Sequence, residues 1–132
     1  MYRLKLMFLF LFIVIFQLTI YGESNKKTIM IDLDGVLDNY TVYTDEIPDI
    51  KNGAKEFVKK LSENYELILF TTRNSKQAVE WLQSNKIDKY FKNVTNVKNP
   101  AYIYIDDRAL KFNGDYNKTI DEIKEFSVYW KQ

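Results

Sequence analysis

One stretch decides the fold: TIMIDLDG, residues 28–35. Its first four residues are apolar or β-branched, which favours a strand buried on both faces, and it ends in a polar turn. Two further apolar runs, 67–70 and 102–105, are also followed by polar residues, Thr71 and Asp106. Strands of a parallel sheet end at a common edge, and open α/β sheets bind ligands at that edge. The sequence therefore predicts that these polar side chains meet in one crevice.

Strand-like and helix-like segments alternate from Lys26 onward, which indicates an α/β fold. We expect a single three-layer, Rossmann-like domain with a mainly parallel central sheet. The remaining elements are read from apolar spacing and from capping residues. They are a helix capped by Asn52, a helix capped by Asn74 or Ser75, a short strand within 91–97 and a last helix over 119–130.

The first 25 residues are unlike the rest of the chain. Arg3 and Lys5 precede an apolar segment at 6–21, which is the layout of a signal peptide or an uncleaved membrane anchor. We therefore expect a hydrophobic helix outside the fold in residues 1–25, a domain over 26–132, and an exported or membrane-anchored protein. The alternatives are a buried apolar helix, or a cytoplasmic protein whose translation starts after this extension.

The composition limits which catalytic groups the chain can use. The chain has 132 residues and no His or Cys, so Ser-His-Asp and Cys-His nucleophiles are excluded, as are imidazole or thiolate zinc sites. Catalysis must use carboxylates, hydroxyls, Lys, Arg or a hard metal ion. The formal net charge of +1 gives no reason to expect bulk nucleic-acid binding. A hydrophobic content of 46% is enough for the core of one domain.

Asp32 and Asp34 are the sharpest chemical signal. Alternate residues of an extended segment point to the same side, so we expect both carboxylates to face one ligand while Gly35 lets the chain turn. Two close carboxylates repel and need a cation or a raised pKa. Such a pair suits phosphoryl transfer, in which one carboxylate attacks phosphorus and the other protonates the leaving oxygen. A calcium loop is the alternative, but its terminal Glu is missing around residues 39–43.

Further polar residues follow the other strands. Asp106 and Asp107 end the run 102–105, and with Asp32 they suit Mg²⁺, which prefers carboxylate oxygens, water and phosphate; a solvated turn is the alternative. The candidates for holding a phosphate are Thr71, Thr72 and Lys98, and Arg73 and Arg108 flank them to bind anions or pair with the aspartates. Thr71 can instead be a helix cap for the segment after Thr72, and Lys98 can be an ordinary exposed lysine.

Taken in order, these residues resemble the four motifs of the haloacid dehalogenase-like superfamily of phosphatases. The first motif resembles residues 32–37, Asp-Leu-Asp-Gly-Val-Leu; the second resembles Leu67 to Thr71, the third is best met by Lys98, and the fourth by Ile105-Asp106-Asp107. The Asp-Asp-Arg ending is most similar to small capless phosphatases of this superfamily. The resemblance covers Thr28 to Asp107 and implies that residues 26–132 form a capless phosphatase domain.

The resemblance also implies roles for these residues. Asp32 would be the nucleophile that forms an aspartyl-phosphate, and Asp34 the acid that protonates the leaving group and later activates water. Mg²⁺ would lie between Asp32, the backbone carbonyl of Asp34 and Asp106, with Asp107 in support. Phosphoryl oxygens would be held by Thr71 and Lys98. The expected activity is Mg²⁺-dependent hydrolysis of a phosphomonoester, and a site without a cap suggests a bulky substrate or closure by another subunit.

Other functions stay open. An Asp-Asp-Arg ending also occurs in 5'-(deoxy)nucleotidases and in phosphatases of nucleic-acid ends. A receiver-like phosphoacceptor domain uses acids, a Thr and a Lys as well, but its acidic pair lies on the first strand, whereas here the pair comes last. An inactive, membrane-tethered binding domain is a third alternative, and intact Asp32, Asp34 and Asp106 argue against it. The expected partner is a phosphorylated substrate, with a membrane contact through residues 6–21 as an option, and the sequence indicates no oligomeric state.

Overall fold

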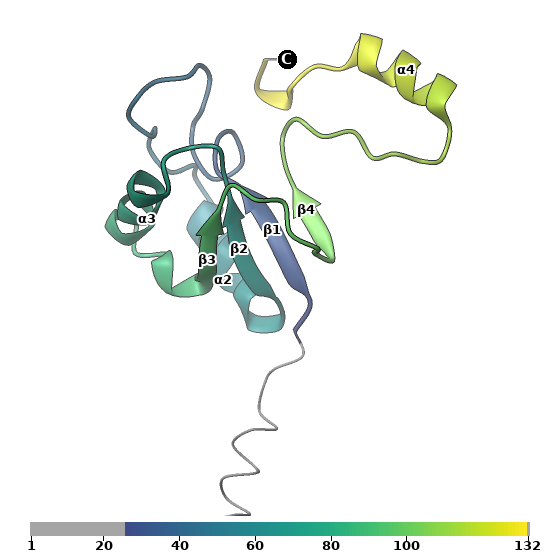
Figure 1. Cartoon of the computed structure of the whole chain (residues 1–132). Helices are drawn as coiled ribbons and strands as arrows, with labels where there is room; N and C mark the ends of the chain where they lie inside the picture. Colours follow the sequence, from purple (N-terminus) through teal and green to yellow (C-terminus); the bar gives the residue numbers. More distant parts are fainter. Residues whose placement is uncertain (1–25, 132) are drawn as a thin grey trace, which may run out of the picture.

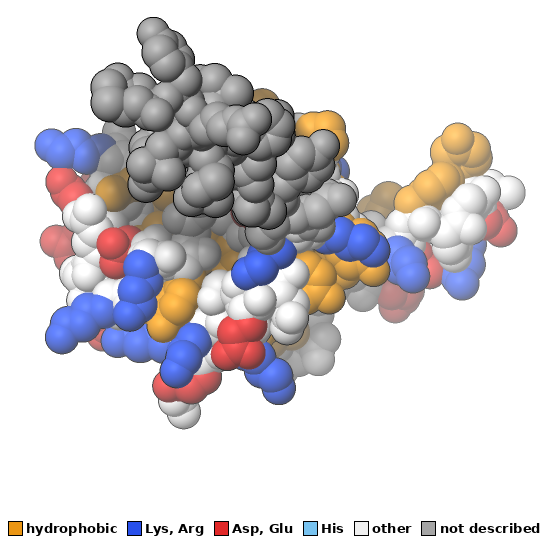
Figure 2. Space-filling view, turned by 90° about the horizontal axis from the view of Figure 1, so that it is seen from below, with side chains coloured by type: hydrophobic (Ala, Val, Ile, Leu, Met, Phe, Trp, Pro, Cys, Tyr) orange, Lys and Arg blue, Asp and Glu red, His pale blue; other side chains and the backbone are white. Residues whose placement is uncertain are grey.

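The structure is a computed structural model that describes residues 26–131. The hydrophobic helix expected in residues 1–25 lies outside the described residues. Within the described part, every helix is too short or too polar to span a bilayer. Figure 2 shows basic and acidic side chains interspersed over the face seen from below, in keeping with the near-zero net charge.

A parallel sheet forms the centre of the domain, as expected for an α/β fold. Its strands are β1 (Thr28–Asp32), β2 (Glu66–Phe70), β3 (Phe91–Thr95) and β4 (Ile103–Ile105). They lie in the order β3-β2-β1-β4, all parallel (Figure 1). Asp32 pairs with Phe70 of β2, and Ile31 pairs with Ile105 of β4. The residues that follow β2 and β4 therefore flank Asp32 at the carboxyl edge.

Two helices cover one face of the sheet. α2 (Ala54–Asn64) joins β1 to β2, and α3 (Ser75–Ser84) joins β2 to β3. The core between these layers is apolar, and each fully buried Leu, Ile or Val in it contributes roughly 1.5–3 kcal/mol. It includes Ile29, Ile31, Leu67 and Leu69 from the sheet, Val58 from α2 and Leu82 from α3. This packing fixes the strands, and hence the positions of the residues at their ends.

Helix starts follow the local capping chemistry. Asn74 caps α3 as expected, because its side chain accepts hydrogen bonds from the backbone N–H groups of Lys76 and Gln77 at 3.0 and 3.2 Å. The predicted cap of α2, Asn52, is wrong by one residue. Gly53 occupies that position with a φ of +85°, a left-handed conformation that glycine adopts without strain, and it offers no side-chain cap.

The last helix differs from its prediction at both ends. α4 spans Tyr116–Glu125 rather than 119–130, because Asp115 caps it by accepting from the backbone N–H of Lys118 at 3.0 Å. Beyond it, a separate short turn of 3₁₀ helix, η2 (Tyr129–Lys131), carries Trp130. α4 projects away from the sheet (Figure 1), and Ile120 and Ile123 are 52% and 59% exposed. α4 therefore does not form the third layer that the sequence predicts.

Candidate active site

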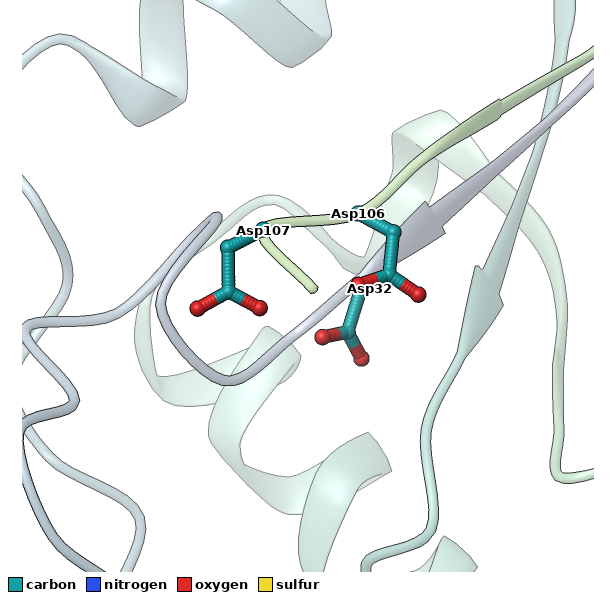
Figure 3. Close-up of side chains that lie close together, drawn as sticks. All are labelled: Asp32, Asp106 and Asp107. Atoms are coloured by element: carbon teal, nitrogen blue, oxygen red, sulfur yellow. The ribbon is translucent and has the colours of Figure 1, made fainter. Parts of the chain in front are cut away.

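Three aspartates gather at the carboxyl edge of the sheet. Asp32 ends β1, and Asp106 and Asp107 directly follow β4, its parallel neighbour. One carboxylate oxygen from each lies within 4.8 Å of the others, close enough for all three to contact one cation (Figure 3). The pairing of β1 with β4 thus brings Asp32 together with residues that lie more than seventy positions later in the chain.

The Asp32 carboxyl resists ionisation. Its pKa is raised from 3.8 to about 7, mainly by burial and also by the nearby carboxylates of Asp106, Asp107 and Asp34, while a hydrogen bond from the backbone N–H of Leu33 acts in the opposite direction. A positive charge placed among these oxygens would oppose every one of the raising effects except burial. The electrostatics of the site therefore favour a cation beside Asp32.

One carboxylate oxygen of Asp107 accepts a hydrogen bond, and the other has no hydrogen-bond partner. Its side chain is only 1% exposed, and its Oδ2 accepts a hydrogen bond from the indole Nε1 of Trp130 at 2.6 Å. Its Oδ1 is buried with no hydrogen-bond partner. An unpaired buried carboxylate oxygen is costly unless it binds a proton or a metal. The donor set consists of hard, anionic oxygens and fits Mg²⁺.

Asp34 points into a different environment. Its carboxylate accepts from Arg73, with Nε 3.0 Å from both oxygens and Nη2 2.7 Å from Oδ1. Arg73 is buried, and its hydrogen bonds to Asp34 raise the pKa of the guanidinium further above its ordinary value. Arg73 also donates to the backbone oxygen of Thr44, in the long loop between β1 and α2. Asp34 is therefore not one of the three aspartates whose oxygens lie within 4.8 Å of one another, although its charge still acts on Asp32.

The predicted phosphate-binding residues occupy three different settings. Thr71 is buried directly after β2, and its Oγ1 accepts from the backbone N–H of Arg73 at 3.1 Å, which leaves its hydroxyl proton free to donate. Thr72 is exposed beside it. Lys98 is exposed in the connection before β4, and its ammonium lies 4.5 Å from the ring centroid of Tyr104. No described contact joins Lys98 to the three clustered aspartates, so its phosphate role stays a prediction.

Several residues around the turn after β1 were not identified from the sequence. Asp38 is fully buried, and its Oδ1 accepts a hydrogen bond from the backbone N–H of Gly35 at 2.8 Å. Burial and, to a lesser extent, the nearby Asp34 carboxylate raise the pKa of Asp38 to about 6. The Gly35 carbonyl accepts from Lys51 Nζ at 3.1 Å and from the Tyr129 hydroxyl. Of these residues, only Asp38 lies close enough to Asp34 in sequence to be suspected from the sequence. Lys51 and Tyr129 come from distant segments.

Comparison with known proteins places this geometry in a family. The family model of NLI interacting factor-like phosphatases matches residues 27–127. A solved structure of a conserved protein from Bacteroides thetaiotaomicron is similar, with a TM-score of 0.55 and 26% identity over 76% of this chain and 92% of that one. No curated protein matches significantly. The chain belongs to the NLI interacting factor-like phosphatase family, a capless family of haloacid dehalogenase-like phosphatases.

Proposed function

We propose that the chain is a Mg²⁺-dependent phosphomonoester hydrolase that works through an aspartyl-phosphate on Asp32. The observation that carries the proposal is the group of Asp32, Asp106 and Asp107, with one oxygen of each within 4.8 Å of the others, in a phosphatase family member. Bound Mg²⁺ would neutralise these carboxylates and polarise a phosphoryl oxygen. The buried, unpaired Oδ1 of Asp107 supports its presence.

The chemistry assigned to the chain's own residues has two steps. In the first, an oxygen of the Asp32 carboxylate attacks phosphorus, the P–O bond to the leaving group breaks, and Asp34 gives its proton to the leaving oxygen. In the second, Asp34 takes a proton from a water molecule, the water oxygen attacks phosphorus, and the P–O bond to Asp32 breaks. The products are an alcohol and inorganic phosphate, and both aspartates return to their starting states.

Arg73 holds the proton-transfer group in place. It makes three hydrogen-bond contacts with the Asp34 carboxylate. The same contacts fix the direction in which the Asp34 oxygens point. Arg73 therefore acts as a positioning residue for the proton-transfer group. Thr71 contributes a hydroxyl donor at the end of β2, beside β1, where a phosphoryl oxygen would need one.

The test measures phosphate release from an aryl phosphate by the full-length chain, with Mg²⁺ and with EDTA. Asp32→Asn removes the nucleophile and Asp34→Asn removes the proton donor, so both should lower kcat by at least about 100-fold. Asp45→Asn, an exposed change in the loop after β1, is the matched control and should leave kcat unchanged. Wild-type activity in EDTA, or full activity in Asp32→Asn, would rule the proposal out.

A further inference from the structure

The C-terminal segment returns to the catalytic edge after α4. In Figure 1 the end of the chain lies above the carboxyl ends of the strands, away from α4. Val128 is buried at 8% exposure, the Tyr129 hydroxyl donates to the Gly35 carbonyl, and the Trp130 indole donates to Asp107. Residues 128–130 therefore contact both the turn after β1 and the aspartate pair after β4.

The fit between Trp130, Asp107 and Gly35 is tight. A Cβ added to Gly35 would lie 2.5 Å from Asp107 Oδ2 and 2.9 Å from Trp130 Nε1, closer than real contacts allow. The indole ring is held from other sides as well, edge-on to Tyr40 with centroids 5.7 Å apart and with the Arg108 guanidinium 5.6 Å from it. The indole N–H therefore has one fixed direction, toward Asp107.

This hydrogen bond determines how Asp107 presents itself to the other aspartates. A carboxylate rotates freely unless one oxygen is bound, and here Oδ2 is bound by Trp130. Oδ1 is left buried and unpaired. In metal sites, groups that hydrogen-bond a ligand orient it, and losing such a group typically weakens metal binding by about 10–100-fold.

We propose that Trp130 is a positioning residue for the divalent-cation site, in which its indole N–H binds Oδ2 of Asp107 and leaves Oδ1 as a metal ligand. The inference rests on the proposed function only to the extent that a cation binds beside Asp32, Asp106 and Asp107. It assigns to the C-terminal segment a part in building the active site of a domain that has no cap.

The experiment measures Mg²⁺ affinity of the full-length chain by calorimetry, without substrate. Trp130→Phe keeps an aromatic ring and removes the N–H, and should weaken Mg²⁺ binding by about 10–100-fold. Trp81→Phe is the matched control, because the Trp81 indole also donates, to the Pro48 carbonyl at 2.8 Å, but away from the aspartates. It should leave the affinity unchanged. Since the chain has two Trp, the control variant also reports Mg²⁺ binding through Trp130 fluorescence.

A double-mutant cycle separates positioning from a general loss of structure. If Trp130 acts through Asp107, Trp130→Phe should have no further effect on Mg²⁺ affinity once Asp107→Asn is present. Equal affinities of wild type and Trp130→Phe, or independent effects of the two changes, would overturn the inference. Those results leave the proposed function standing if Asp32→Asn still abolishes binding. A wild-type chain that binds no Mg²⁺ would defeat both.

Discussion

Replacing Asp32 by Asn should stabilise the metal-free fold while removing its proposed nucleophile. Burial and three neighbouring carboxylates raise the pKa of Asp32 from 3.8 to about 7. A raised folded-state pKa means that the stability contributed by this group is fully present below about pH 4 and is lost as the pH rises to about 7. The difference between 3.8 and about 7, at about 1.4 kcal/mol per pKa unit, amounts to roughly 4 kcal/mol. Asn does not titrate and escapes this loss.

The assay is urea unfolding in EDTA at several pH values between 4 and 8. The free energy of unfolding of Asp32→Asn should exceed that of wild type by a margin that grows by up to roughly 4 kcal/mol over this range and is flat above pH 7. Asp38, whose pKa is raised to about 6, titrates in both proteins and cancels in the difference. Mg²⁺ at pH 8 should stabilise only wild type. A margin that does not change with pH would refute this account of the site.

Two further substitutions test the surroundings of the turn after β1. Arg73→Lys keeps the charge but loses the planar guanidinium that makes three contacts with Asp34. We expect kcat to fall by up to about 100-fold with little change in KM. An unchanged kcat would contradict a positioning role. Gly35→Ala adds a Cβ 2.5 Å from Asp107 Oδ2, so urea unfolding should show a loss of about 1–3 kcal/mol and calorimetry a weaker affinity for Mg²⁺. Gly114→Ala is the control, with a similar φ of +91° and open space around it; an equal loss in both variants would show that backbone strain alone is responsible.

The sequence was sufficient to predict the sheet and the edge where the aspartates meet. Apolar runs that end in Asp or Thr are a strong signal, because buried parallel strands need no polar alternation. The expectation that Asp32 and Asp34 face one ligand followed from strand alternation and stays a prediction, but Asp34 is not part of the extended strand and its carboxylate is held by Arg73. The physical reason is that the strand ends at Asp32: the Leu33 carbonyl accepts from the backbone N–H of Leu37 at 2.9 Å, so the chain is already turning at Asp34.

The C-terminal region shows where periodicity loses its information. Apolar residues spaced three and four apart predicted one helix over 119–130, and the spacing does hold within α4. Phe126, however, has an extended backbone with a ψ of 128° and ends the helix. Helical spacing also says nothing about which surface an apolar face contacts, and the hydrogen bond from Trp130 to Asp107 joins residues 23 positions apart. Such a contact follows from the tertiary fold and has no local signal.

The turn after β1 is held by residues that carry out none of the proposed chemistry. The Gly35 N–H donates to Asp38, and the Gly35 carbonyl accepts from Lys51 and Tyr129, which lie 16 and 94 positions away in the chain. Misplacing a reacting group by about 1 Å can lower the rate by about 100-fold, so hydrogen bonds that hold this turn from several directions would favour catalysis. In this member of a capless family, these hydrogen bonds come from the long loop between β1 and α2 and from the C-terminal segment. The four motifs therefore contain the groups to which we assign the chemistry, and segments outside the motifs hold the turn after β1 in position.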